Sequence, residues 1–260
     1  MKKIKLVILT MVALGTGVPV SEAGYSLLNS ASDFAVLGAS TVTSTGNTVV
    51  NGNLGVFPGS AITGFGPGIV NGITYLGGAV AQQAAIDALN AYTVLGSEGI
   101  FQSLSGQNLG GLMLGPGVRN FSSSAQLTGV LVLDAQGDAN ARFDFQVGST
   151  LTTASGSSVQ LINGAQANNV NWQIGSSATI GSDTAFIGSI LADQSITLNS
   201  GASLIGRALA LHGAVTMDNN YIIETASVPE PGNLLASSLA VTALLVWKGV
   251  AKWRRKTKGV

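Results

Sequence analysis

The stretch Ala178-Thr179-Ile180-Gly181-Ser182 returns eighteen residues later as Ile196-Thr197-Leu198-Asn199-Ser200, and this internal repeat decides the fold. The same shift places residues 186–192 on residues 204–210, and a further step of nineteen residues reaches Val215-Thr216-Met217. In the other direction, a shift of twenty-seven residues places Leu151-Thr152-Thr153 on Ala178-Thr179-Ile180. Unequal steps that keep one column aligned predict a β-solenoid, a stack of coils whose loops differ in length.

In four of the repeats the aligned three-residue segment has threonine in the middle and mostly apolar residues on either side of it. Because side chains alternate between the two faces of a strand, the neighbours should point inward and the threonines outward. We therefore expect a ladder of hydroxyl groups about 4.8 Å apart, formed by Thr152, Thr179, Thr197 and Thr216. The alternative is that threonine serves only strand propensity on a solvated face.

The composition points to many short strands and tight turns. Only 9% of the 260 residues are charged, 35 are glycine, and the mean hydropathy is +0.42. Residues 24–227 hold ten acidic residues against Arg119, Arg142 and Arg207, a formal charge of −7. Such a domain lacks the basic face that phosphate contacts need, which argues against nucleic-acid binding. The chain has no cysteine, so disulfides, thiolate catalysis and cysteine zinc sites are excluded.

The amino terminus has the pattern of a secretory signal peptide. Lys2, Lys3 and Lys5 precede an apolar run over residues 6–18, and Ser21-Glu22-Ala23 offers small residues for a signal peptidase. We expect residues 1–23 to be removed by cleavage after Ala23. The alternative is a first transmembrane anchor, for which the run is short.

One segment has the pattern of a helix. Between Gly78 and Leu95, apolar residues recur at steps of four and three, and glycines bound the segment. The stripe consists of Ala81, Ala85, Ala88, Tyr92 and Leu95. Because this stripe is narrow and rich in alanine, we expect the helix to cover one open face of the solenoid.

The carboxyl terminus, residues 228–260, is a separate segment. Pro229-Glu230-Pro231 is followed by an uncharged run over residues 234–247 and then by the basic cluster Arg254-Arg255-Lys256. The run is shorter than a membrane span unless flanking lysines extend toward the headgroups, and the basic tail should stay in the cytoplasm. These three parts together resemble a PEP-CTERM sorting signal. The resemblance implies recognition by an exosortase at the inner membrane, removal of the tail, and delivery to the surface or matrix of a Gram-negative bacterium.

The domain between these segments, residues 24–227, resembles the microbial ice-binding-like family. The likeness extends over residues 30–223 and is carried, in order, by Phe34-Ala35-Val36-Leu37, Asn51-Gly52-Asn53-Leu54-Gly55-Val56, residues 58–65, Phe143-Asp144-Phe145-Gln146-Val147, Gly206-Arg207-Ala208-Leu209-Ala210 and Ala214-Val215-Thr216-Met217-Asp218. It implies a mainly β fold, a discontinuous right-handed β-solenoid of triangular section with one α-helix packed along a face. It also implies ice binding through a flat face with a loose Thr-Ala/Gly-x-Thr/Asn motif.

Three segments match that motif, and none has threonine at both ends. They are Ser155-Gly156-Ser157-Ser158, Ser182-Asp183-Thr184-Ala185 and Ser200-Gly201-Ala202-Ser203. Threonine has a stiff χ1 and a methyl group beside its hydroxyl, both of which serine lacks. We therefore expect weak activity from Ser155, Ser158, Ser182, Thr184, Ser200 and Ser203, and treat the threonine ladder as the rival surface.

The sequence offers little sign of catalysis. His212 is the single histidine, and Asp193, Arg207 and Asp218 are its nearest charged neighbours in sequence. The repeat explains Arg207 as the residue that stands where Ser189 stands one coil earlier. No phosphate-binding or metal-binding motif is present, although Asp134 and Asp138 could hold Ca²⁺ loosely. We expect a binding protein with no enzymatic activity, no cofactor and no dedicated metal site.

Two functions remain open at this stage. The first is a secreted protein that binds ice or ordered water at a flat Thr/Ser face. The second is a structural or adhesive surface protein that binds polysaccharide in an extracellular matrix without affecting ice. Ice and a sugar lattice would both select for a flat array of hydroxyl groups.

Overall fold

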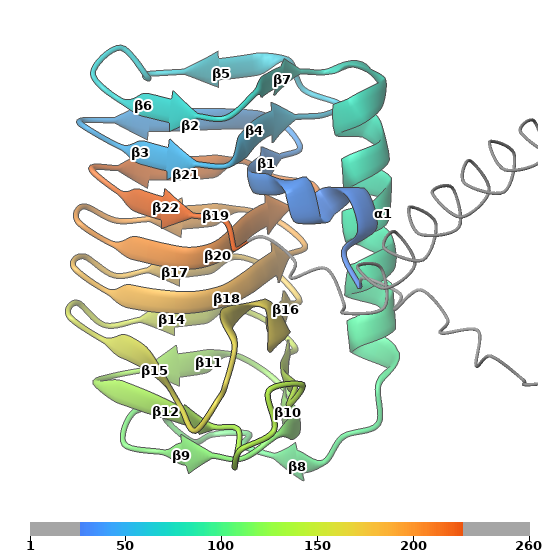
Figure 1. The fold of residues 1–260 in the computed structure, drawn as a ribbon, viewed down its shortest axis with the longest axis vertical. Helices are drawn as coiled ribbons and strands as arrows, with labels where there is room; N and C mark the ends of the chain where they lie inside the picture. Colours follow the sequence, from blue (N-terminus) through green and yellow to red (C-terminus); the bar gives the residue numbers. More distant parts are fainter. Residues whose placement is uncertain (1–26, 226–260) are drawn as a thin grey trace, which may run out of the picture. The chain divides into compact units, whose positions relative to one another are not determined.

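The computed structural model describes residues 27–225 (Figure 1). The predicted signal peptide, residues 1–23, and the predicted sorting signal, residues 228–260 with Pro229, Glu230 and Pro231, lie outside these residues. So does the apolar run over residues 234–247. Within residues 27–225, no helix has both the length and the apolar character needed to cross a membrane.

The described chain is mainly β, and all of its paired strands run parallel. One sheet has seven strands, and we call its outward side the hydroxyl face. In spatial order its strands are β11 (Ala125–Leu127), β14 (Leu151–Thr153), β17 (Ala178–Ile180), β19 (Ile196–Leu198), β21 (Val215–Asp218), β2 (Thr41–Thr45) and β5 (Ala61–Thr63).

A fifteen-stranded sheet forms the other two sides of the stack. The side on which the single α-helix packs, which we call the helix side, contains β8 (Gln102–Ser103), β10 (Gly117–Phe121), β13 (Phe143–Val147), β16 (Val170–Ile174), β1 (Phe34–Gly38), β4 (Asn53–Val56) and β7 (Thr74–Leu76). The third side contains β9 (Met113–Leu114), β12 (Val130–Asp134), β15 (Ser158–Ile162), β22 (Tyr221–Ile223), β3 (Val49–Asn51) and β6 (Ile69–Asn71). The longer strands β18 (Ala185–Ala192) and β20 (Ser203–Ala210) belong to both.

The repeat in the sequence corresponds to the register of the strands. Ala178 pairs with Ile196, Phe186 with Leu204, and the whole of β18 with β20 at the expected shift. Between the sheets, inward side chains form one continuous core. Its centre is aromatic, because Trp172 stacks on Phe145 with ring centroids 3.9 Å apart and lies against Phe186.

The order of the coils in space differs from their order in sequence. The first coils, β1 to β7, form one end of the stack, and the α-helix α1 (Gly78–Ser97) carries the chain to β8 at the opposite end (Figure 1). The later coils then return, so that β21 pairs with β2, β20 with β1 and β22 with β3. We call these three pairings the seam. They join the coils that precede the helix to the coils that follow it.

Helix α1 packs on the helix side through small residues. Its buried members are Ala81, Ala84, Asp87, Ala88, Ala91 and Leu95. The predicted stripe does face the sheet, with Ala85 and Tyr92 packed half-buried at its margin, and Ala84 and Ala91 join it. Alanine lets the helix approach Leu37, Leu191 and Leu209 of the sheet closely. Asp87 is buried because its carboxylate accepts hydrogen bonds from the backbone and hydroxyl of Ser30, in the 3-10 helix η1 (Asn29–Asp33).

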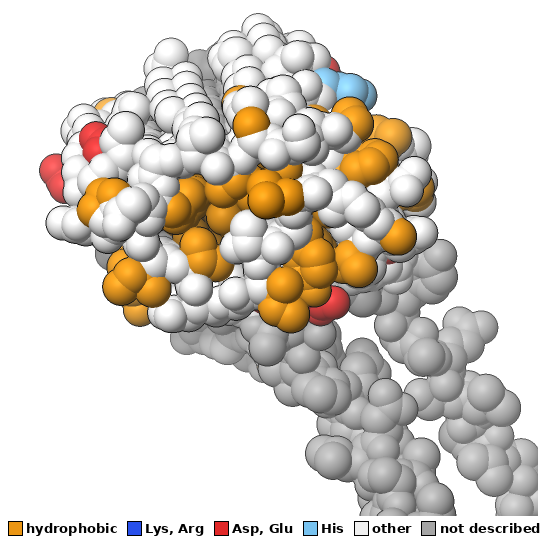
Figure 2. Space-filling model, turned by 90° about the horizontal axis from the view of Figure 1, so that it is seen from above, with side chains coloured by type: hydrophobic (Ala, Val, Ile, Leu, Met, Phe, Trp, Pro, Cys, Tyr) orange, Lys and Arg blue, Asp and Glu red, His pale blue; other side chains and the backbone are white. Residues whose placement is uncertain are grey.

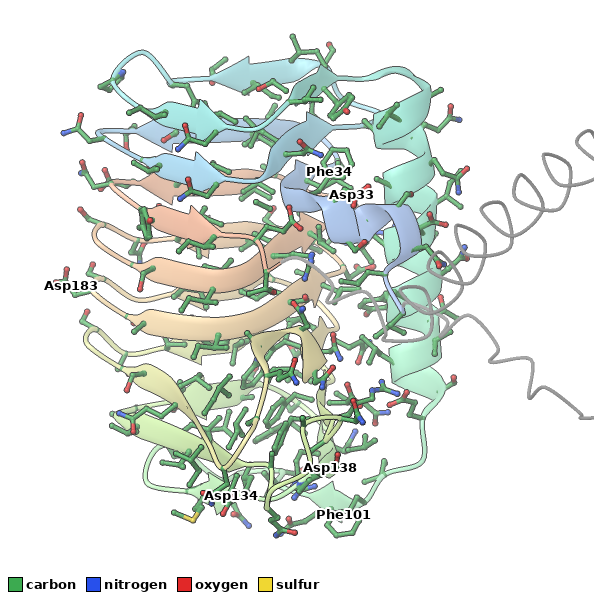
Figure 3. All side chains as sticks on the ribbon, in the orientation of Figure 1. Asp33, Phe34, Phe101, Asp134, Asp138 and Asp183 are labelled. Atoms are coloured by element: carbon green, nitrogen blue, oxygen red, sulfur yellow. The ribbon has the colours of Figure 1, made fainter. Side chains whose placement is uncertain are left out.

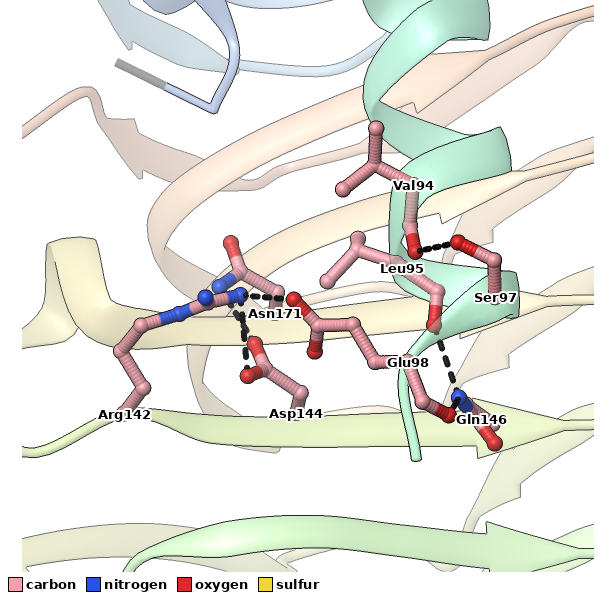
Figure 4. A network of polar contacts seen from close by, with 8 residues as sticks. All are labelled: Val94, Leu95, Ser97, Glu98, Arg142, Asp144, Gln146 and Asn171. Atoms are coloured by element: carbon pink, nitrogen blue, oxygen red, sulfur yellow. Dashed lines mark hydrogen bonds and ion pairs between the residues drawn. The ribbon is translucent and has the colours of Figure 1, made fainter. Parts of the chain in front are cut away.

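A polar network anchors the last turn of α1 (Figure 4). The Gln146 amide donates to the carbonyl oxygens of Leu95 at 2.8 Å and Glu98 at 2.9 Å. Arg142 bridges the carboxylates of Glu98 at 2.9 Å and Asp144 at 3.0 Å. Asn171 donates to Asp144 at 2.8 Å. The helix is thereby fixed to β13 and β16 rather than only resting on them.

Arg207 fixes the seam. Its position opposite Ser189 is the one the repeat predicts, yet its guanidinium is buried and does more than replace a serine. It donates to the carbonyl oxygens of Ser32 at 2.8 Å and Thr225 at 2.6 Å, and pairs with Glu224 at 3.4 Å. One side chain thus joins η1, β20 and the residues that follow β22.

Asp144 should make the stability of the fold depend on pH. Burial raises the pKa of Asp144 to about 6, against the lowering effects of Asn171 and Arg142. A carboxyl group with a folded-state pKa above its unfolded value stabilises the fold below the unfolded pKa, and this stability is lost as pH rises through the folded pKa. The free energy of unfolding should therefore increase between pH 7 and pH 4.5, on the order of 1 to 3 kcal/mol.

Asp144→Asn should remove most of that increase, because asparagine keeps a carbonyl acceptor for Asn171 and does not titrate. Urea unfolding at several pH values measures the effect. The pKa of Glu224 is also raised by burial, so Glu224 should account for the rest of the increase in the free energy of unfolding. Asp183→Asn on an exposed corner is the control, and an equal change in both variants would contradict the assignment.

Candidate functional site

A row of threonine side chains runs along the hydroxyl face. Register pairs Thr152 with Thr179, Thr179 with Thr197, and Thr197 with Thr216. Each of the four is half-buried or exposed, whereas the residues on either side of it are buried. Strand spacing places successive threonines about 4.8 Å apart. The four threonines identified from the repeat therefore form an outward ladder.

The structure extends this ladder by two members that the sequence analysis missed. Across the seam, Thr216 pairs with Thr43, and Thr43 pairs with Thr63. The hydroxyl oxygens of Thr43 and Thr216 lie 3.4 Å apart. Thr43 follows the inward residue Val42, and Thr63 follows the inward residue Ile62. This apolar-Thr pattern in the sequence could have identified both residues as members of the ladder. We call Thr63, Thr43, Thr216, Thr197, Thr179 and Thr152 the threonine ladder; Gln126 continues the row on β11.

A second row of mostly hydroxyl side chains lies two residues before the ladder, at the first residue of β2 and β5 and one residue before the start of the other five strands. Because the coils stack in register, these residues accompany the ladder along the stack. They are Thr41, Ser195, Ser177, Thr150 and Ser124, with alanine at positions 214 and 61. The Ser124 and Thr150 hydroxyls are hydrogen-bonded at 2.8 Å, and the backbone N–H of Ser195 donates to the Ser177 hydroxyl at 3.3 Å. Part of this row therefore holds one coil to the next.

The two rows form an uncharged surface of small side chains. Except for Gln126, each member is threonine, serine or alanine. The nearest charged group along these strands is Asp218 at the end of β21, which accepts a hydrogen bond from the Thr45 hydroxyl at 3.0 Å. Inward residues fix the rows from below, because Val42, Leu151, Ile196 and Val215 are fully buried. The result is a regular array on a stiff support.

Comparison with known proteins decides the family. The family model described as ice-binding-like matches residues 36–223, most of the chain. The chain belongs to the ice-binding-like family. An ice-binding protein of Nostoc sp. (strain HG1) is 54% identical over 223 residues, which are 82% of each chain.

Solved structures of ice-binding proteins share the fold of this family member. One from an Antarctic biological consortium has 45% identity and a TM-score of 0.74, and the match covers 75% of this chain and 89% of that one. Another, from the Antarctic ascomycete Antarctomyces psychrotrophicus, has 37% identity and a TM-score of 0.75, and the match covers 77% and 98%.

The positions that match the family motif lie at a corner of the stack instead of on one flat face. Ser155, Ser182 and Ser200 occupy turns between the hydroxyl face and the third side, next to residues with positive φ at 156, 183 and 201. Thr184 was expected at the surface, and this was wrong. Its side chain is 1% exposed, and its hydroxyl bonds to the Thr153 hydroxyl and the Ala154 carbonyl oxygen inside the stack.

Ser158 and Ser203 begin the third side, where the outward row is uneven. Ser158 pairs with Ala185, Ala185 with Ser203, and Ser203 with Tyr221. Tyr221 is half exposed and stands beside Ser203, and Val49 and Ile69 continue the row. The outward row of the third side therefore includes bulky side chains, whereas the threonine ladder and its continuation consist of threonine and Gln126.

The ionisable residues considered for chemistry have structural partners. The His212 ring lies 3.1 Å from the Asp193 carboxylate and 3.0 Å from its backbone carbonyl oxygen, at an exposed corner. Asp134 accepts hydrogen bonds from the backbone of Gln136 and the side chain of Asn163, and Asp138 from the backbone of Asn140. Figure 3 shows Asp134 and Asp138 toward the β8 and β9 end. Among residues 27–225, no three His, Asp or Glu side chains gather as metal ligands would.

Proposed function

We propose that this protein binds ice through the threonine ladder and its companion row, without enzymatic activity. The observation that supports this most directly is the register of six threonines on adjacent strands of the hydroxyl face, in a member of the ice-binding-like family. We also propose that the coils wind in the right-handed sense with a triangular section. Three strand sides per coil and the usual hand of parallel crossovers support it.

Threonine suits this role for a physical reason. Its hydroxyl can anchor a water molecule, its methyl group packs against the apolar part of a water cage, and its χ1 is restricted by β-branching. Parallel hydrogen bonds fix the spacing between strands, so the array is ordered before it meets ice. Little entropy is then lost as successive threonines engage, and the surface should gain affinity with each regularly spaced group.

A second candidate function is adhesion to polysaccharide at the cell surface or in an extracellular matrix. It is supported by the serine-rich motif positions and by the sorting-signal resemblance at residues 228–260. Thermal hysteresis and ice recrystallisation assays on the purified protein, beside a binding assay with isolated exopolysaccharide, separate the two functions. Ice activity no greater than that of an inert protein at equal concentration, together with polysaccharide binding, would establish the second.

We further propose that the protein is exported and processed at both ends. The charge and hydropathy of residues 1–23 support cleavage by signal peptidase, and residues 228–260 support transient insertion in the inner membrane and recognition by an exosortase. The domain over residues 24–227 would then reach the cell surface or the medium of a Gram-negative bacterium. Its lack of cysteine is compatible with that location.

Thr197→Tyr tests the surface. Thr197 lies in the middle of the ladder, and a protruding ring there should keep its neighbours from the ice lattice, so most thermal hysteresis should be lost. The inward residues Ile196 and Leu198 are unchanged, so circular dichroism and the melting temperature should stay close to those of the native protein. Ser203→Tyr on the third side is the matched control and should keep activity. The reverse result would assign binding to the motif-matched corner.

Replacing Pro229-Glu230-Pro231 by three alanines tests the processing. If an exosortase reads this motif, the altered protein should remain in the inner membrane at full length, because its tail is not removed. Fractionation and immunoblotting in the native host measure this. Release of a domain of normal size would show that the tripeptide is incidental.

A further inference from the structure

Asn-Gly dipeptides stand at two stacked corners of the protein. Asn51 ends β3 and Asn71 ends β6, and in both coils the glycine that follows turns the chain from the third side to the helix side. The register pairs Asn51 with Asn71, and the Asn71 amide donates a hydrogen bond to the Asn51 side-chain oxygen at 2.8 Å. The corner therefore stacks one asparagine on the other.

The corner also requires glycine after each asparagine. Gly52 has a φ of 133°, and a Cβ on Gly72 would lie 2.2 Å from the Gly52 carbonyl oxygen. A side chain at either position would strain the backbone or push the two coils apart. The close approach of the coils thus maintains the Asn-Gly dipeptide in both of them.

An asparagine followed by glycine can lose ammonia without an enzyme. The backbone nitrogen of the glycine forms a bond with the asparagine Cγ, and the side-chain nitrogen leaves as ammonia with the proton that the backbone nitrogen gives up. Water then opens the five-membered imide at one of its two carbonyl carbons, which leaves aspartate or isoaspartate. Glycine has no side chain to hinder the attack, so this dipeptide is the reactive one among the thermolabile asparagines.

The two corners differ in how the attacking nitrogen is held. The Gly52 N–H donates to the Asn71 carbonyl oxygen at 3.2 Å, and Gly52 is half-buried. By contrast, β6 is a terminal strand that pairs with β3 alone. Among residues 27–225 the Gly72 N–H has no acceptor, and both Asn71 and Gly72 are exposed. The outer coil therefore protects the inner dipeptide, and no coil of the described chain lies over the outer one.

A third pair, Asn163-Gly164, lies in a turn that hydrogen bonds hold closed. The Ala165 N–H donates to the Ile162 carbonyl oxygen at 3.1 Å, and the Asn163 amide donates to the Asp134 carboxylate at 2.8 Å. During the attack the side-chain oxygen of the asparagine gains negative charge, which a neighbouring carboxylate disfavours. We therefore expect this pair to react more slowly than the pair at residues 71 and 72.

We propose that Asn71 is a site of spontaneous deamidation by water, and that its conversion loosens the end coil of the stack. The product carries a carboxylate, which has no hydrogen to donate to Asn51. In isoaspartate the backbone also runs through the former side chain and is longer by one carbon atom. Both changes weaken the pairing of β6 and β7 with β3 and β4, where the Leu54 N–H donates to the Ile73 carbonyl oxygen at 3.0 Å.

The conversion would place a charge where the chain has none. From Phe34 to Ile86 the sequence contains no Asp, Glu, Lys, Arg or His. Figure 2 views this end of the stack and shows hydrophobic and uncharged polar side chains across its centre. The same coil carries Thr63, the last member of the threonine ladder. The inference is nevertheless independent of ice binding, because neither its chemistry nor its test involves ice.

Mass spectrometry of chymotryptic peptides tests the site. The full chain is aged in mildly alkaline buffer, and conversion of Asn51, Asn71 and Asn163 is followed in the same samples. Asn71 should convert about tenfold faster or more than the other two, because local opening is easiest at an unpaired edge. In urea, where the fold no longer distinguishes the three pairs, their rates should become similar. Equal rates in the folded chain, or faster conversion of Asn51 or Asn163, would overturn the proposal. An Asn71 that converts in urea but stays intact in the folded chain would overturn it as well.

Hydrogen exchange tests the loosening of the end coil. After ageing, the Leu54 amide should exchange about tenfold faster than in fresh protein. Asn71→Gln keeps an amide but would have to form a six-membered imide, which is much slower, so its Leu54 exchange should not change on ageing. Asn163→Gln is the matched control and should loosen as the native chain does. Unchanged Leu54 exchange after Asn71 has converted, or equal loosening in aged Asn71→Gln, contradicts the structural part of the proposal.

Discussion

The register of parallel backbone hydrogen bonds across the seam is the constraint on which the rest of the structure depends. Chain segments more than 170 residues apart, such as β2 and β21, become neighbours there. Arg207 binds the carbonyl oxygens of Ser32 and Thr225 from the middle of this region. Gly206, with a φ of 146°, lets β20 approach Gly188 so closely that a Cβ would overlap its carbonyl oxygen. A shift of one residue at the seam would turn every threonine of one half inward.

The hydroxyl face follows from that register. Coils before and after the helix contribute to one ladder only because β21 pairs with β2 in the register that places Thr216 opposite Thr43. The inward valine, isoleucine and leucine residues hold each strand in place, and hydroxyl contacts such as Ser124 with Thr150 add support between coils. The same parallel pairing that buries the core therefore sets the spacing of the surface groups.

Charge is distributed according to position in the stack. Arg142, Asp144 and Glu98 hold the last turn of α1, Arg207 and Glu224 hold the seam, and Arg119 lies beneath the final coil of the β8 end. The two rows of the hydroxyl face are uncharged. These charges thus serve contacts between elements, while the hydroxyl face is left to hydroxyl groups and small side chains.

The sequence by itself determined the strand repeat, the outward position of Thr152, Thr179, Thr197 and Thr216, and the helix near residues 78–95, because alternation and periodicity are local properties. It also carried the family resemblance. Only the tertiary structure decided that Thr43 and Thr63 join the ladder, that Thr184 is buried, and that Tyr221 stands beside Ser203. Each of these depends on which coil lies next to which, and a discontinuous stack places neighbours by long-range pairing that no local pattern encodes. The burial of Arg207 and Asp144 has the same origin, since their partners come from segments distant in the chain.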